Sequence, residues 1–92
     1  SHLNWQHGFV VRALQFAPGT AIAAHSREEE EVLFVQQGNL QVTVDGQTVV
    51  LGKGDNFTTP IGAVRTFAQQ GEEPCLVYIT RRGDSPVAPR FI

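Results

Sequence analysis

The sequence predicts an all-β domain, either a sandwich or a barrel. Turn-forming residues, mostly Gly, Pro and Asp, recur along the 92 residues and divide them into short segments. The segments between the turns are rich in Val, Phe, Ile, Leu and Thr, and several alternate in polarity with a period of two. None of them is long enough for an ordinary helix, so strands are the expected elements.

We expect strands in seven segments, each bounded by turn residues. They are residues 9–16, 31–36, 40–44, 48–51, 56–59, 64–68 and 75–80. Asp45-Gly46 separates the third segment from the fourth and predicts a type I′ hairpin, because both residues tolerate a positive φ. Only residues 26–31 could make a helical turn, and their consecutive glutamates would repel one another in it.

Length, charge and cysteine content limit the classes of function. A chain of 92 residues has room for one core. Seven Lys and Arg against nine Asp and Glu give a net charge of −2, which argues against nucleic acid or an anionic membrane as partner. No apolar run approaches the ~18 residues of a spanning helix. Cys75 has no second cysteine to pair with, so we expect a reducing, cytoplasmic location.

Two of the expected strands carry apolar residues on both faces. In residues 31–35, Leu33 and Val35 point to one face, while Val32 and Phe34 point to the other. Residues 9–16 share this property. Because a small antiparallel sheet normally leaves one face in water, we expect a homodimer or a second domain to cover the other apolar face. Scattered surface hydrophobic residues are the alternative interpretation.

Glycines, a proline and several polar residues stand at characteristic, unequal spacings in two stretches, 19–38 and 54–69. They are Gly19, His25, Arg27, Glu31 and Gly38 in the first, and Gly54, Asp55, Pro60, Gly62, Arg65 and Gln69 in the second. This spacing resembles the two motifs of the cupin superfamily, and the resemblance covers roughly residues 8–80. It implies a cupin-type double-stranded β-helix, or jelly-roll, barrel.

The resemblance also implies a metal site, from which this sequence departs. The family pattern supplies two His and one Glu from the first motif and a third His from the second. Here His25 and Glu31 keep their places, while Arg27 and Arg65 occupy the other two. A guanidinium has no lone pair to give a metal and repels a cation. We therefore expect no metal cofactor; a divalent ion at His25 and Glu31 is the disfavoured alternative.

The cupin arrangement would bring four polar side chains, His25, Arg27, Glu31 and Arg65, into one cavity, with Phe67 as a candidate apolar wall. Two Arg against one Glu leave a positive site, so the expected ligand is a small anion such as a carboxylate, a sugar acid or phosphate. The alternative is an internal ion pair in which one or both arginines bridge the glutamate. Residues 28–30 are expected to form a solvated loop, from which one carboxylate could still reach inward.

We interpret the chain as one cupin domain over residues 1–92, with an N-terminal strap at 1–8, the barrel at 9–80 and a tail at 81–92. The expected function is a non-catalytic or vestigial cupin with a small-molecule pocket. Two enzymatic alternatives stay open. One is a metal-independent isomerase or epimerase on a small sugar or organic acid, with His25 as acid or base and Glu31 orienting it. The other is a metal-dependent cupin enzyme with a rebuilt ligand set. The covering partner would be a second copy or a second cupin domain.

Overall fold

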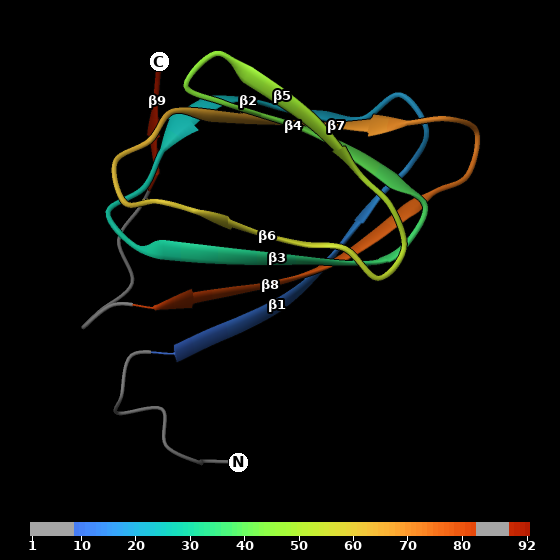
Figure 1. Ribbon diagram of the computed structural model, residues 1–92, viewed down its shortest axis with the longest axis horizontal. Coiled ribbons are helices and arrows are strands. Elements are labelled where there is room, and N and C mark those ends of the chain that lie inside the picture. Colours follow the sequence, from blue (N-terminus) through green and yellow to red (C-terminus); the bar gives the residue numbers. More distant parts are fainter. Residues whose placement is uncertain (1–8, 83–88) are drawn as a thin grey trace.

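Two antiparallel β-sheets packed face to face make up the computed structural model, which describes residues 9–82 and 89–92 (Figure 1). The strands within these residues are β1 (Phe9–Phe16), β2 (Ala21–Ser26), β3 (Glu30–Gln37), β4 (Asn39–Val44), β5 (Gln47–Leu51), β6 (Asn56–Thr59), β7 (Arg65–Gln70), β8 (Cys75–Arg82) and β9 (Arg90–Phe91). One sheet has the order β1-β8-β3-β6 and the other β5-β4-β7-β2-β9. The predicted all-β jelly roll is confirmed.

The structure departs from the sequence prediction in several strands and connections. The strand β2 was not among the expected segments, because its run of alanines has a weak strand propensity. Residues 27–29 form a bend between β2 and β3, so the possible helical turn there is not realised. The expected tail contributes to both sheets, since β8 continues to Arg82 and β9 pairs with β2. The expected strap, residues 1–8, lies outside the described residues.

No helix in the described part of the chain has the length and apolar character needed to cross a membrane.

The hairpin between β4 and β5 forms as the sequence predicts. Asp45 has a φ of 49° and Gly46 a φ of 82°, which is the backbone that a type I′ turn requires. A second turn depends on close approach as well as on conformation. Gly38 has a φ of 77°, and a Cβ added there would lie 2.5 Å from the carbonyl oxygen of Pro74. Only glycine satisfies both conditions at this position.

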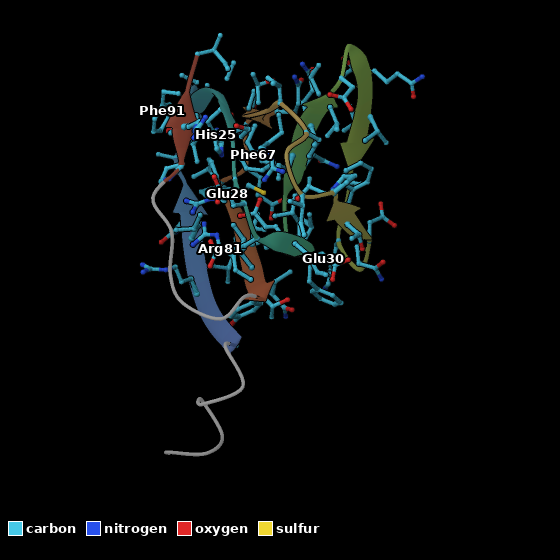
Figure 2. All side chains as sticks on the ribbon, turned by 90° about the vertical axis from the view of Figure 1, so that its left-hand side faces the viewer. His25, Glu28, Glu30, Phe67, Arg81 and Phe91 are labelled. Atoms are coloured by element: carbon cyan, nitrogen blue, oxygen red, sulfur yellow. The ribbon has the colours of Figure 1, made fainter. Side chains whose placement is uncertain are left out.

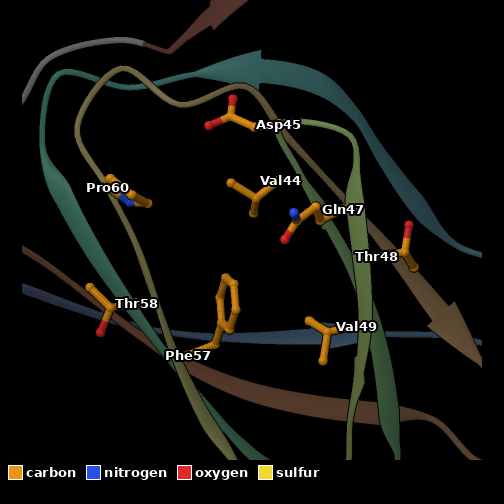
Figure 3. Close-up of a pocket in the computed structure, with 8 residues that line it drawn as sticks. All are labelled: Val44, Asp45, Gln47, Thr48, Val49, Phe57, Thr58 and Pro60. Atoms are coloured by element: carbon orange, nitrogen blue, oxygen red, sulfur yellow. The ribbon is translucent and has the colours of Figure 1, made fainter.

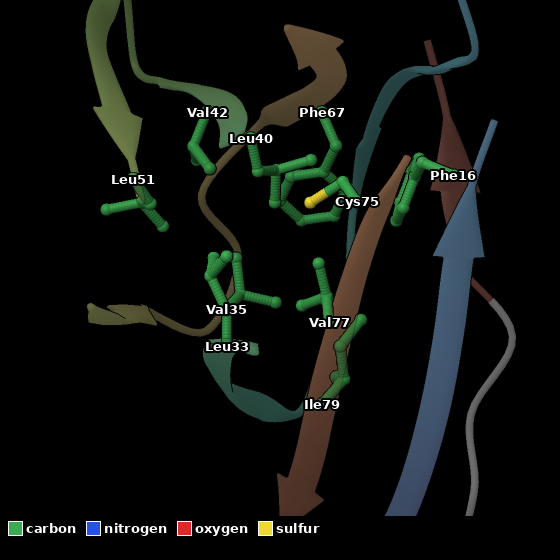
Figure 4. Packing of buried hydrophobic residues seen from close by; sticks show 10 residues of the cluster. All are labelled: Phe16, Leu33, Val35, Leu40, Val42, Leu51, Phe67, Cys75, Val77 and Ile79. Carbon is green, nitrogen blue, oxygen red and sulfur yellow. The ribbon is translucent and has the colours of Figure 1, made fainter. Parts of the chain in front are cut away.

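The apolar core fills the barrel between the inner faces of the two sheets (Figure 4). Its buried members are Phe16, Leu33, Val35, Leu40, Val42, Leu51, Phe67, Cys75, Val77 and Ile79. Burying one such large side chain stabilises the fold by about 1.5–3 kcal/mol. Three of the core strands continue the same inward face into charged residues: Glu31 precedes Leu33, Arg65 precedes Phe67, and Arg81 follows Ile79. The interior of the barrel is therefore apolar over most of its length and charged at the end where Glu31, Arg65 and Arg81 lie.

Candidate functional site

Glu31 lies at the centre of a buried charged cluster inside the barrel. Its strand β3 runs between β8 and β6, and the register places Arg81 opposite Glu31 on one side and Thr59 on the other. The carboxylate accepts hydrogen bonds from Arg81 Nε at 2.7 Å and from Arg65 Nη1 at 3.0 Å. Thr59 Oγ1 donates to the backbone oxygen of Glu31 at 3.1 Å. Glu31 is fully buried, and both of its carboxylate oxygens are engaged by arginines.

Arg65 reaches from β7, in the facing sheet, to Glu31, so this ion pair joins the two sheets. Each of its three side-chain nitrogens donates a hydrogen bond. Nη1 donates to Glu31, Nε to the carbonyl of Ala63 at 2.9 Å, and Nη2 to the carbonyl of Pro60 at 2.9 Å. Burial lowers the pKa of Arg65, and the adjacent Glu31 carboxylate raises it again. The guanidinium stays protonated, and it is held by groups of this chain rather than presented to a ligand.

Arg27 extends the cluster from the bend after β2. Its Nε lies 3.5 Å from Glu31 Oε2, and its Nη1 lies 3.6 Å from Glu29 Oε1. The solvated loop expected for residues 28–30 is right for Glu28, whose side chain is 65% exposed. It is wrong for Glu29, which is 3% exposed, and for Glu30, which begins β3. The ion pair with Arg27 Nη1 compensates the cost of burying the Glu29 carboxylate. Three guanidiniums and two carboxylates leave the cluster with one net positive charge.

His25 borders the cluster and is only 2% exposed. Its Nδ1 lies 2.8 Å from the carbonyl oxygen of Ala23. Its ring contacts Phe67 edge-on, with centroids 5.8 Å apart, and Phe91 of β9 at 5.3 Å; Figure 2 shows the three side chains together. Burial is the main reason that the pKa of His25 is lowered, and the charge of Arg65 lowers it further, against the raising effects of the Ala23 carbonyl and Glu31.

This lowered pKa predicts a loss of stability in acid. A base whose folded pKa lies below its ordinary value of 6.5 is neutral in both states at higher pH, so it costs nothing there. As the pH falls below 6.5, the unfolded chain binds the proton first, and the free energy of unfolding decreases until the folded pKa is passed. His25→Phe keeps a ring and removes the proton site. We expect urea unfolding between pH 7 and pH 5 to show a smaller loss of stability in this variant than in wild type; equal losses would contradict the assignment.

The structure brings the predicted site residues into one region. His25, Arg27, Glu31 and Arg65 surround the charged cluster, and Phe67 packs on the His25 ring within the core. Sequence reasoning missed Arg81 and the hydroxyl of Thr59, whereas an inward carboxylate from residues 28–30 was anticipated as an alternative and is Glu29. Arg81 had a usable signal, because it continues the period-two set Cys75, Val77 and Ile79 that faces the core. The glutamate run has no such periodicity, so the pattern did not indicate which of its carboxylates is buried.

The side chains present do not fit the metal that the cupin resemblance implies. Arginines stand at two of the four ligand positions that the resemblance implies, and the oxygens of Glu31 are occupied by Arg65 and Arg81. Among the residues that the structure describes, no group of three or more His, Cys, Asp or Glu side chains could hold a metal ion. A cation placed beside Glu31 would meet three guanidiniums and be repelled by them.

A pocket of about 230 Å³ opens beside the cluster. It is lined by Ser26, Arg27, Glu28, Gly62 and Arg90. The side chain of Arg27 is 14% exposed, so it reaches from the buried cluster to this pocket. Arg90 Nη2 lies 3.8 Å from Glu28 Oε2, and both side chains are largely exposed. Such a solvent-exposed pair is weak, so an incoming anion can compete with Glu28 for Arg90.

Comparison with solved structures shows the same fold in other proteins, two of which are described as cupins. The cupin domain of Schizosaccharomyces pombe Cnp3 matches with a TM-score of 0.80 and 22% identity, over 84% of this chain and 54% of its own. DMSP lyase DddQ from Ruegeria pomeroyi gives 0.83 and 22%, over 92% of this chain and 43% of its own. An RmlC-like cupin from Shewanella frigidimarina gives 0.76 and 24%, over 83% and 67%. This chain spans about half the length of the first two.

The search of curated proteins gave no match. The family model Cupin_2, described as a cupin domain, matches residues 13–81. That match includes the charged cluster from Arg27 to Arg81 and both turns discussed above. Since it covers most of the 92 residues and agrees with the jelly-roll architecture, the chain belongs to the cupin family.

Proposed function

We propose that this cupin domain is a non-catalytic binding domain that takes a small anion at the mouth of its barrel and holds no metal. The observation that carries the proposal is the ion-pair cluster in which Arg27, Arg65 and Arg81 surround Glu31 at the family's metal position. If a metal ligand set is lost in evolution, the buried carboxylate must gain cationic side chains as partners, because an unpaired buried charge costs several kcal/mol. A cytoplasmic location stays a prediction from the sequence.

The anion is placed at the mouth pocket rather than at Arg65. Arg65 spends its three nitrogens on Glu31, Ala63 and Pro60, whereas Arg27 and Arg90 both line the pocket. Two guanidiniums can hold a carboxylate, sulfate or phosphate by charge-assisted hydrogen bonds. The volume of about 230 Å³ suits a small ligand of this kind. The ligand class is therefore a small carboxylate, sugar acid or phosphate.

Burial of the two catalytic candidates favours binding over chemistry. His25 is 2% exposed beneath the Phe91 ring, and Glu31 is fully buried beneath its arginines. A general base must come within hydrogen-bond reach of the proton that it removes from the substrate. The same burial argues against the alternative of a metal-independent isomerase or epimerase, and the donor set argues against a rebuilt metal site.

Thermal melting with added anions tests the proposal. An anion at ten times its Kd adds about 1.4 kcal/mol, which raises the Tm of a domain this small by ~5–10 °C. We expect glucuronate, sulfate or phosphate to give such a rise over sodium chloride of equal ionic strength. Arg90→Gln should remove most of the rise, while Lys53→Gln, the same charge change in the loop between β5 and β6, should keep it. No anion-specific rise, or one that survives Arg90→Gln, would overturn the proposal.

We infer that a second copy of this chain covers the outer face of the sheet β1-β8-β3-β6. Val11 is 58% exposed on this face, Phe34 41% and Tyr78 40%. Phe34 and Tyr78 stand opposite each other in the register, so their side chains form one apolar patch. We expect sedimentation velocity to give a dimer that Phe34→Arg converts to a monomer. A wild-type monomer at about 100 μM would contradict a homodimer with the ~1,200 Å² or more that a stable interface buries.

A further inference from the structure

A second cleft, of about 440 Å³, lies between β5 and β6 (Figure 3). These are the terminal strands of the two sheets, so the barrel is not closed by a strand pair along this side. The register gives Val49 and Phe57 the same inward direction as the core residues Val42 and Leu33. Figure 3 shows Val44, Val49 and Phe57 directed toward one another across the opening.

The cleft combines an apolar floor with one unpaired charge. Val44, Val49, Phe57 and Pro60 supply the apolar surface, and Val49 remains 38% exposed although it faces inward. Asp45 stands at one end, held by the hairpin turn and by its backbone N–H, which donates to the carbonyl of Val64 at 3.1 Å. Within residues 9–82 and 89–92, no cation lies within ion-pair distance of its carboxylate.

The charges of Arg65 and Asp45 interact through space, but the two side chains form no ion pair. Arg65 lies on β7 beside Val44, but its guanidinium is turned to Glu31 and to the carbonyls of Ala63 and Pro60. A carboxylate next to an uncovered aromatic and aliphatic wall suits a ligand with a cationic head and an apolar body. The arginine-lined mouth pocket favours the opposite charge.

We propose that the β5–β6 cleft is a second ligand site, which binds a small primary amine with an aromatic or branched aliphatic body. The apolar body lies between Val49 and Phe57, and the ammonium group reaches the Asp45 carboxylate. The Gln47 amide, which also lines the cleft, is placed to accept or donate one further hydrogen bond. This site is independent of anion binding at Arg27 and Arg90, because the two pockets share no lining residue.

Amide chemical shifts in a titration with 2-phenylethylamine test this site. Phenylacetate serves as the control, since it has a similar body with the opposite charge. A ligand of this size binds with a Kd in the millimolar range. We expect the amine to shift the amides of residues 44–49 and 57–58, and phenylacetate to leave these unmoved. Shifts that phenylacetate does produce around Ser26 and Arg27 would report the mouth pocket and bear only on the proposed function.

Two variants and one control complete the test. Asp45→Asn keeps the turn, because Asn also tolerates a positive φ, and should weaken amine binding about tenfold by removing a charge-assisted contact. Val49→Lys places an ammonium group of the chain itself in the cleft and should abolish binding. Glu72→Gln, the same loss of charge in the exposed turn before β8, should change nothing. Equal shifts from phenylacetate, unchanged affinity in Asp45→Asn, or no shifts from the amine up to its solubility would each overturn the proposal.

Discussion

The Glu31→Gln variant is expected to lose about 3–5 kcal/mol of unfolding free energy, a large part of the stability of a small domain. Glutamine keeps the shape of the side chain and removes its charge. Three buried or nearly buried guanidiniums, those of Arg27, Arg65 and Arg81, would then face one another with only Glu29 to balance them. Urea unfolding followed by circular dichroism of the β-sheets measures the loss.

The control for this variant is the same Glu-to-Gln substitution at an exposed glutamate, Glu28. Glu28 pairs with Arg90 at 3.8 Å, and its side chain is 65% exposed. We expect Glu28→Gln to change stability by no more than ~0.5 kcal/mol, as is usual for exposed ion pairs. Comparable stabilities for the Glu31 and Glu28 variants would mean that the cluster does not hold the two sheets together.

Arg65→Met is expected to cost about 3–5 kcal/mol, for a different combination of reasons. Methionine fills much of the volume, but the Ala63 carbonyl loses the Arg65 donor and part of Glu31's charge loses its partner. The Pro60 carbonyl keeps only the backbone N–H of Ala63, at 3.3 Å. Each buried polar group left without a partner costs about 1–3 kcal/mol. Arg65→Lys keeps the charge and loses the planar fork, so it should fall between Arg65→Met and wild type.

A double variant separates the ion pair from general damage to the core. Residues that share one network do not add, so Glu31→Gln with Arg65→Met should cost less than the two single variants together. Arg12→Met, at an exposed position on β1, is the control for the side-chain change and should be nearly neutral. Additivity within ~0.5 kcal/mol would show that Glu31 and Arg65 act independently, contrary to the 3.0 Å contact.

Most of the fold could be predicted from local patterns. Period-two alternation places Leu33 and Val35 inward, and Asp45-Gly46 fixes the hairpin, because these signals depend on a few neighbouring residues. The strand β2 could not be identified in the same way. Alanines carry little preference for strands, so β2 owes its conformation to pairing with β7 and β9, which lie far away in the sequence.

The sequence predicted which residues lie together at the site but not which of them form ion pairs. The family spacing places His25, Glu31 and Arg65 together, as the structure does. Which arginine forms an ion pair with which glutamate depends on distances across the two sheets. The sequence alone does not give these distances. Arg81 forms an ion pair with Glu31 because the β3–β8 register places the two residues opposite each other. A shift of this register by one residue would move the Arg81 side chain to the other face of the sheet. The proposed anion site accordingly lies at Arg27 and Arg90, since the partners of Arg65 all belong to this chain.

The proposal that an arginine–glutamate cluster replaces the cupin metal is tested most directly by measuring metal content and stability together. Tag-free protein would be analysed by mass spectrometry for total metal, and its Tm recorded before and after treatment with a chelator. We expect far less than one equivalent of any transition metal and the same Tm in both samples, because Glu31 is already satisfied by Arg65 and Arg81. Close to one equivalent of a transition metal, with a Tm that collapses on chelation, would contradict this structure of the site and restore a metal-dependent function.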